Sequence, residues 1–172
     1  MNSKKILVPV TLAEGSGASL AVAFRLAEDL SASLVLLHVV PEGGAAEIAQ
    51  AEVKLQKLAE KTHMSVPIEC TVSVGLAAQQ IVVKAFALKV DTMVMCTHGY
   101  RGWFGWSHRN TVREVLGRVH CPVWLISPSP VGDIPTLSVL SKEEERQNFP
   151  HGGRQANLFP FPASLRTLLT AG

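Results

Sequence analysis

The stretch DTMVMCTHG, residues 91–99, carries the pattern that decides the fold. Its run of β-forming, mostly apolar residues from Thr92 to Thr97 has a carboxylate before it and a glycine after it. A short run without apolar/polar alternation is typical of a strand that is buried on both faces of a parallel sheet. The stretch therefore predicts a central strand that ends in a turn.

Similar runs recur along the first 127 residues, with longer stretches of helical periodicity between them. The other predicted strands are Ile6–Val10, Leu34–Val40, Ile68–Val74 and Pro122–Ile126. Apolar strands separated by helices indicate a parallel sheet that is covered on both sides, and right-handed crossovers leave few ways to wind it. We predict an α/β fold: a three-layer, doubly wound, Rossmann-like sheet of five parallel strands in the order 3-2-1-4-5. Its ligand crevice is expected at the carboxyl ends of the strands.

Composition fits one globular domain of a soluble protein. The chain has 172 residues, of which 47% are hydrophobic and 17% charged, and its net charge is +2. A balance so close to neutral gives no electrostatic case for nucleic acid or for a membrane surface as partner. The three cysteines, Cys70, Cys96 and Cys121, lie in apolar runs, as small buried hydrophobes do. We expect a reduced protein of the cytoplasm.

Composition changes after Ile126. Six of the ten prolines fall within residues 128–172, a segment without tryptophan or cysteine. We therefore expect a domain at residues 1–127 and a Pro/Gly-rich C-terminal extension at residues 128–172. Its apolar residues, among them Phe149 and Phe159, are candidates to pack on the domain or on a partner subunit. A flexible extension is the alternative.

Four separated pieces of the chain resemble universal stress proteins. Lys5–Val10 is similar to the first strand of that family, and Val72–Ile81 to its third strand and helix. Asp91–Gly99 resembles the fourth strand and loop, and His120–Ile126 the closing strand. The resemblance implies a regulatory protein of the stress response. It also implies the phosphate loop of the ATP-binding branch, G-x-x-G, nine residues, then G-[ST], whose backbone N–H groups and helix N-terminus meet the phosphates.

The chain departs from that motif at several points of contact. Gly99 keeps the second glycine, and the nine-residue spacer Tyr100–His108 is intact. Four positions differ, where Asp at the end of the first strand, the first glycine, the third glycine, and Ser or Thr are usual: Thr11, Cys96, Arg109 and Asn110.

Each departure has a physical consequence. Thr11 lacks the charge that would help to hold a metal, and Cys96 adds a side chain where glycine let the backbone approach. Arg109 places a long cation where bare backbone would meet the phosphate, and either fills that space or binds an anion itself. Asn110 is predicted to N-cap the following helix. Nucleotide recognition is therefore expected to be impaired or altered.

The resemblance defines a candidate crevice and its ligands. Its predicted residues are Pro9, Val10, Thr11, Val39, Cys96, Thr97, Gly99, Arg109, Asn110 and Thr111. No cofactor is firmly implied; ATP or AMP is the expected ligand class, with magnesium only if ATP binds. Two alternatives stay open: an ATP- or AMP-binding stress sensor that works through a rearranged loop, and a small nucleotide hydrolase.

Two surfaces are predicted to meet partners. The family usually dimerises through its last strand, and the apolar run Val123, Trp124, Leu125 and Ile126 would be a pairing hazard if it stayed open. We therefore expect a homodimer. The aromatic residues Trp103, Phe104 and Trp106 either tuck back onto the sheet or bind a protein partner.

Catalytic and metal chemistry find little support in the sequence. Cys96 and His98 are two residues apart, but a zinc site needs two more ligands at suitable spacing. There is no G-x-S-x-G elbow, so we expect neither a metal nor a catalytic residue. His38 is interpreted as a satisfied core histidine and Asp91 as a cap or surface charge.

Overall fold

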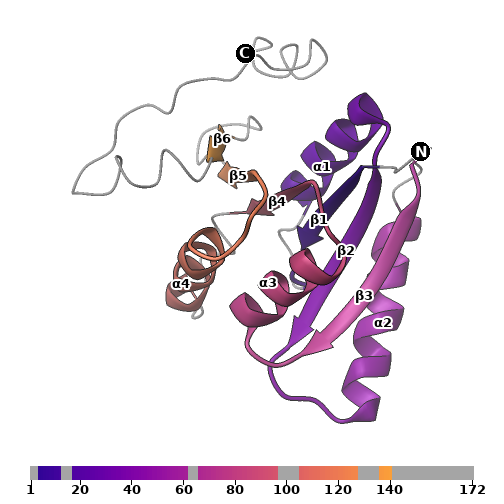
Figure 1. Ribbon diagram of the computed structural model, residues 1–172. Coiled ribbons are helices and arrows are strands. Elements are labelled where there is room, and N and C mark those ends of the chain that lie inside the picture. The colour runs from indigo at the N-terminus through magenta and orange to yellow at the C-terminus, as the bar shows by residue number, and fades with distance from the viewer. Residues whose placement is uncertain (1–3, 13–16, 62–65, 97–104, 128–135, 141–172) are drawn as a thin grey trace.

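The computed structural model describes residues 4–12, 17–61, 66–96, 105–127 and 136–140 of the chain. Figure 1 shows strands and helices alternating along most of this length. The strands are β1 (Lys5–Pro9), β2 (Ser33–Val40), β3 (Ile68–Val74), β4 (Thr92–Cys96), β5 (Val123–Ser127) and β6 (Thr136–Leu140). The helices are α1 (Gly17–Leu30), α2 (Ala45–Glu60), α3 (Ala77–Ala87) and α4 (Gly105–Leu116).

The six strands form one sheet in the order β3-β2-β1-β4-β5-β6. The first five are parallel, so the predicted doubly wound sheet with strand order 3-2-1-4-5 is confirmed. Leu7 of β1 lies opposite Val35 of β2 on one side and Met93 of β4 on the other. The sixth strand was not predicted, and it pairs antiparallel with β5.

Burial of the central strands on both faces explains the three layers. Ile6, Leu7 and Val8 of β1 are all fully buried, although successive side chains point to opposite faces. Ile6 and Val8 belong to a cluster with residues of α1 and α2, whereas Leu7 belongs to a second cluster with residues of α3 and α4. One helix pair therefore covers each face of the sheet.

The helices bury one stripe each. In α2 the buried residues are Ala51, Leu55 and Ala59, at the spacing of four that keeps them on one face. In α3 the buried residues are Ala78, Ile81 and Ala85. Among the helices that the structure describes, none is both long enough and apolar enough to cross a membrane.

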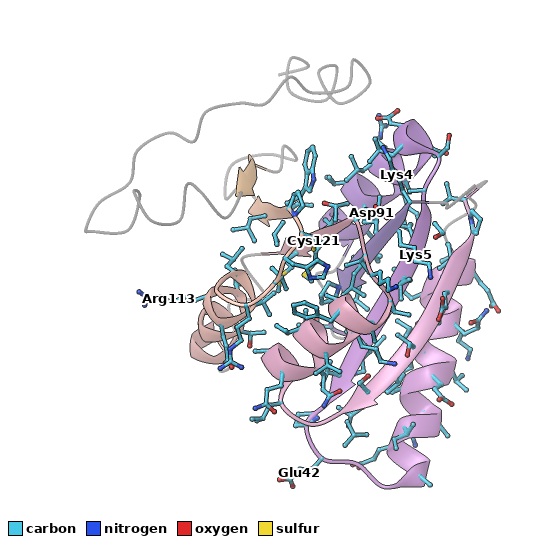
Figure 2. All side chains as sticks on the ribbon, in the orientation of Figure 1. Lys4, Lys5, Glu42, Asp91, Arg113 and Cys121 are labelled. Carbon is cyan, nitrogen blue, oxygen red and sulfur yellow. The ribbon has the colours of Figure 1, made fainter. Side chains whose placement is uncertain are left out.

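Polar contacts hold the amino ends of the central strands together. The backbone N–H of Lys5 donates to the carboxylate of Asp91 (2.8 Å), and the N–H of Asp91 donates to the carbonyl of Lys5 (2.9 Å). The hydroxyl of Thr92 donates to the carbonyl of Pro122 (3.0 Å). Asp91 was interpreted as a cap or a surface charge, and it is an exposed carboxylate that accepts the backbone hydrogen bond of Lys5. Figure 2 labels Lys5, at the start of β1, and Asp91, directly before β4.

The last parallel strand is not an open edge. Residues Val123–Ser127 of β5 pair in register with Leu140–Thr136 of β6. A later segment of the same chain therefore lies along the edge of Val123–Ile126 that was predicted to pair with another subunit. The homodimer through this edge stays a prediction.

A glycine controls the turn from β3 to α3. Gly75 has φ +128°, a conformation that side-chain-bearing residues rarely adopt, and an added Cβ would lie 3.2 Å from Nε2 of Gln80. We expect Gly75→Ala to lower the free energy of unfolding by about 1–3 kcal/mol because of this backbone strain. Denaturation in urea, followed by circular dichroism, measures the change.

Gly117 offers the matched control. It does not have positive φ, and an added Cβ would meet only ordinary contacts, the nearest at 3.7 Å from the carbonyl oxygen of Arg113. Gly117→Ala should raise stability by about 0.4–1 kcal/mol, since alanine has fewer conformations to lose on folding. Equal effects of the two substitutions would contradict the assignment of strain to Gly75.

Candidate functional site

The candidate site lies where the order of the strands reverses. From β1 the chain builds the sheet outward through β2 and β3, then returns to the other side of β1 with β4 and β5. The crossovers on the two sides therefore diverge from the carboxyl ends of β1 and β4, which is where doubly wound sheets bind ligands. Pro9 ends β1 at this edge and is followed by Val10 and Thr11, and Cys96 ends β4.

Hydrogen bonds fix the half of the crevice that β1, β2 and β3 form. The N–H of Val10 donates to the carbonyl of Leu37 (2.8 Å), which extends the ladder one residue beyond β1. Nδ1 of His38 lies 2.9 Å from the carbonyl oxygen of Val10. Because a carbonyl only accepts, the imidazole must donate from Nδ1. The N–H of Gly75 similarly donates to Val40 (2.9 Å).

Four predicted site residues meet at this half. Pro9 ends β1 and is half-buried, Val10 is buried, and Thr11 is exposed. Val39 lies two residues beyond Leu37, the register partner of Pro9, and packs partly against the second core cluster. The structure therefore presents the exposed Thr11 beside an apolar rim.

The other half of the candidate site was predicted from the segment between β4 and α4. Cys96 is the last residue of β4 and lies opposite Ile126 of β5. The predicted site residues Thr97 and Gly99, and the aromatic residues Trp103 and Phe104, lie outside the described residues. Trp106 is the second residue of α4.

The position of α4 corrects one prediction. Helix α4 begins at Gly105, so Arg109, Asn110 and Thr111 are its fifth, sixth and seventh residues. Asn110 is inside the helix, and the prediction that it is the N-cap was wrong. The apolar stripe from Val112 onward extends backward through Thr111, which is half-buried. The sequence does contain this continuation of the apolar stripe, which indicates an earlier helix start. The preference of asparagine for N-cap positions indicated a later start instead.

This start changes which backbone donors are available. The first four N–H groups of a helix lack a partner within it, and later ones bond to the carbonyl four residues earlier. In α4 the unpartnered donors belong to the first turn, near Gly105–Ser107, and Arg109 lies beyond that turn. The backbone of Arg109 is therefore committed to the helix and is not presented to a phosphate.

Cys70 and Cys121 are partly buried thiols with raised pKa values. Desolvation raises the pKa of Cys121, and the nearby Asp91 carboxylate adds to the rise. Desolvation also raises the pKa of Cys70, with further contributions from Glu60 and Glu69. Both are free thiols and half-buried. Among the described residues, no group of three or more His, Cys, Asp or Glu side chains is placed to hold a metal ion.

The family profile of universal stress proteins matches residues 2–127, which include both core clusters and the whole crevice. The chain belongs to the universal stress protein family. None of the curated proteins matches the sequence significantly. The match ends at the last residue of β5, so β6 lies beyond the part that the family shares.

Solved structures of universal stress proteins share this fold. One is UspA from Lactobacillus plantarum, with 22% identity, a TM-score of 0.57, and coverage of 73% of this chain and 98% of that one. A protein from Archaeoglobus fulgidus in complex with dAMP has 19% identity, a TM-score of 0.58 and coverage of 73% and 98%. A protein from Arabidopsis thaliana with AMP bound has 17% identity, a TM-score of 0.54 and coverage of 74% and 93%. Similarity at this level of identity shows the fold.

One residue of the site escaped the sequence analysis. His38 was predicted to be a satisfied core histidine, and its hydrogen bond confirms that it is satisfied. It is only half-buried, however, and it ties β2 to the end of β1 at the crevice. Its place two residues before the end of a strand that reaches the crevice was the available signal.

The hydrogen bond of His38 yields a stability prediction. His38→Phe keeps a ring of similar shape but leaves the carbonyl of Val10 without this donor, and should cost about 1 kcal/mol of unfolding free energy. His38→Asn, which keeps a donor near the position of Nδ1, should recover part of that loss. Urea denaturation of the three proteins measures it, and equal stability of His38→Phe and the unsubstituted protein would refute the role.

The thiols yield a pH prediction. Since burial raises their pKa, Cys70 and Cys121 should react with iodoacetamide at pH 7.5 several-fold more slowly than a cysteine in an unfolded peptide, and their rates should still be rising above pH 9. The same shifts favour the neutral thiols in the folded state. Their stabilising contribution is complete below the ordinary thiol pKa and is lost as the pH rises toward the raised values. Peptide mass spectrometry of timed samples follows each site separately; thiolate-like rates at pH 7.5 would contradict the prediction.

Proposed function

We propose that this universal stress protein is a regulatory binding protein with altered nucleotide recognition, and that its crevice accepts an adenosine monophosphate in preference to ATP. The observation that carries the proposal is the start of α4 at Gly105, which commits the backbone at Arg109 to the helix. The two halves of the crevice then make separate contributions: Cys96 and Arg109 change the phosphate half, whereas in the other half the departure is Thr11.

The earlier start of α4 shifts the N-terminus of the helix by a distance that can be estimated. A helix capped by Asn110 would begin at Thr111, whereas α4 begins six residues earlier, at Gly105. At 1.5 Å per residue this moves the positive end of the helix by about 9 Å. The span is comparable to that of a triphosphate, so the space and donors for the β- and γ-phosphates are reduced together. A single phosphate needs far less of either.

The nucleoside half keeps features that suit a base or ribose. Val10 is held by Leu37 and His38, and Val39 adds apolar surface beside it. Ligand sites generally combine such apolar walls with a few polar groups on rigid elements. Two proteins of similar fold, from Archaeoglobus fulgidus and Arabidopsis thaliana, were solved with dAMP and AMP. Both ligands carry one phosphate, which supports the choice of ligand class.

The residue at position 11, Thr11, affects whether the site can hold a magnesium ion. Magnesium is usually held by one or two carboxylates together with nucleotide phosphates, and the exposed side chain of Thr11 offers only a hydroxyl. We therefore propose recognition that does not depend on magnesium, and no catalytic step. The two free, half-buried thiols agree with a reducing location such as the cytoplasm.

An ATP sensor with a rearranged loop is the competing function, because the sequence keeps Gly99 and the nine-residue spacer of the ATP-binding motif. Thermal unfolding in the presence of AMP, dAMP or ATP separates the two functions. We expect AMP and dAMP at millimolar concentration to raise Tm measurably, and ATP with magnesium to raise it less, since the shift follows the ratio of free ligand to Kd. A larger rise with ATP than with AMP would overturn the proposal.

Restoring the residues of the ATP-binding motif tests whether their replacement is what weakens ATP binding. We expect the triple variant Thr11→Asp, Cys96→Gly, Arg109→Gly to bind ATP at least tenfold more tightly than the unsubstituted protein, as measured by calorimetry. Glycine inside a helix costs about 1 kcal/mol, and this cost favours a later helix start as well as lower stability. Arg113→Gly is the matched control, because Arg113 is exposed on the same helix and points away from the sheet (Figure 2). ATP affinity that stays unchanged in the triple variant would show that these positions do not block it.

A further inference from the structure

Helix α3 carries an exposed apolar surface on its outer side. Leu76, directly before the helix, and Val83 and Phe86 within it are 67%, 57% and 52% exposed. Their spacing of seven and three residues places them along one side of the helix, and they are named here the α3 apolar face. Figure 1 shows α3 beside α4 in the layer in front of the sheet. We propose that residues 158–169 of the C-terminal extension bind along the α3 apolar face of the same chain.

The outer side of α3 lacks the charged residues that a surface helix usually presents to water. The exposed positions within the helix carry no charge; they are Ala77, Gln79, Val83, Phe86 and Ala87. The one charged residue of the helix, Lys84, is half-buried, and its Nζ donates to the hydroxyl of Thr71 (3.3 Å). Helix α2, by contrast, exposes five charged residues: Glu47, Glu52, Lys54, Lys57 and Glu60. A contiguous apolar surface where charges are usual is typical of a binding surface.

The C-terminal extension contains a segment whose composition matches this surface. Residues 158–169 read LFPFPASLRTLL, with six large apolar side chains and a single charged one, Arg166. A segment of this composition gains free energy when its side chains leave water for an apolar surface. Of the five large hydrophobic residues that are exposed in the described part of the chain, three belong to the α3 apolar face. That face is therefore the apolar surface that such a segment fits best.

The C-terminal extension leaves the sheet close to this face. Strand β6 ends at Leu140, whose register partner is Val123, the first residue of β5. Three residues before Val123, the ring of His120 packs on the ring of Phe86, with their centroids 4.4 Å apart. Paired strands lie about 5 Å apart. The chain beyond Leu140 therefore starts at the end of the sheet where His120 contacts the α3 apolar face.

The connection is long enough to let the segment reach the whole face. Seventeen residues, 141–157, lie between β6 and the segment 158–169. A flexible chain of that length has an r.m.s. end-to-end distance of roughly 20–25 Å, whereas the 11 residues of α3 span about 16 Å. A tether of this kind keeps the segment at an effective concentration in the millimolar range. The segment of the same chain therefore outcompetes that of a second copy at micromolar protein concentration.

Carbene labelling of the unsubstituted, full-length protein tests whether the face is covered. Val83 and Val53 are matched, because they are the same residue type and are 57% and 54% exposed. They lie on helices that cover opposite faces of the sheet. With residues 158–169 in place, peptide mass spectrometry should show Val83 labelled about threefold less than Val53, at both low and high micromolar protein. Equal labelling of the two valines would overturn the proposal.

A variant of the full-length chain tests which segment covers the face. Leu165→Ser, Leu168→Ser, Leu169→Ser removes half of the large apolar side chains of residues 158–169. Labelling of Val83 should then rise to the level of Val53, while the circular dichroism of the domain stays the same. The matched control replaces polar residues of the connection, Gln147→Ser, Gln155→Ser, Asn157→Ser, and should leave Val83 protected. Protection of Val83 that persists in the leucine variant would contradict the proposal.

A photo-cross-link identifies the segment directly. With p-benzoylphenylalanine in place of Val83, irradiation should join position 83 to a peptide from residues 158–169, in a product that keeps the chain mass of 18.5 kDa. The same probe in place of Val53 should give no cross-link to that segment. A product of twice the chain mass would assign the face to a second copy, and the absence of any cross-link from position 83 to residues 158–169 would refute the proposal. No nucleotide takes part in these measurements, so this proposal and the proposed function fail separately.

Discussion

Burial of the central strands on both faces is the constraint on which the rest of the structure depends. Ile6, Leu7 and Val8 of β1 are fully buried, as are Leu34 to Leu37 of β2 to within 1% exposure. No arrangement with a single helical layer could cover such strands, since their side chains alternate between the two faces. Helices on both faces then require crossovers on both sides of β1. That requirement places the reversal of strand order between β1 and β4.

The two ends of the sheet have different roles. At the amino ends, Asp91 and Lys5 exchange hydrogen bonds, and Thr92 reaches Pro122, so that β1, β4 and the start of β5 are tied. At the carboxyl ends, the described backbone bonds that continue the ladder are those of Val10 with Leu37 and of Gly75 with Val40, on the side of β2 and β3. The crevice thus has one half whose backbone is fixed by the sheet and another half, between β4 and α4, that depends on the local sequence.

Sequence analysis predicted the parts that burial dictates. The strand Ile68–Val74 was predicted with its observed bounds, and the other parallel strands to within one residue wherever both ends are described. Strands of this kind can be predicted because several consecutive apolar residues all indicate the same buried structure. The start of α4 escaped prediction because its signals conflict: Gly102 and Gly105 resemble loop residues, and Asn110 resembles a cap. Preferences of about 1 kcal/mol at single residues cannot decide between such alternatives. Tertiary packing of the Thr111 and Val112 stripe extends the helix instead.

The strand β6 escaped prediction for a related reason. Its sequence, TLSVL, alternates polar and apolar residues only briefly, and the prolines before it are typical of an irregular extension. A strand of five residues forms only where an unpaired edge accepts it, so its existence depends on the geometry of β5 more than on its own propensity. Strand β5 also links β6 to β4. Cys96 and Ile126 are register partners, and Ile126 pairs with Leu137 on its other side. The pairing of β6 therefore adds one further strand to the ladder that includes the end of β4.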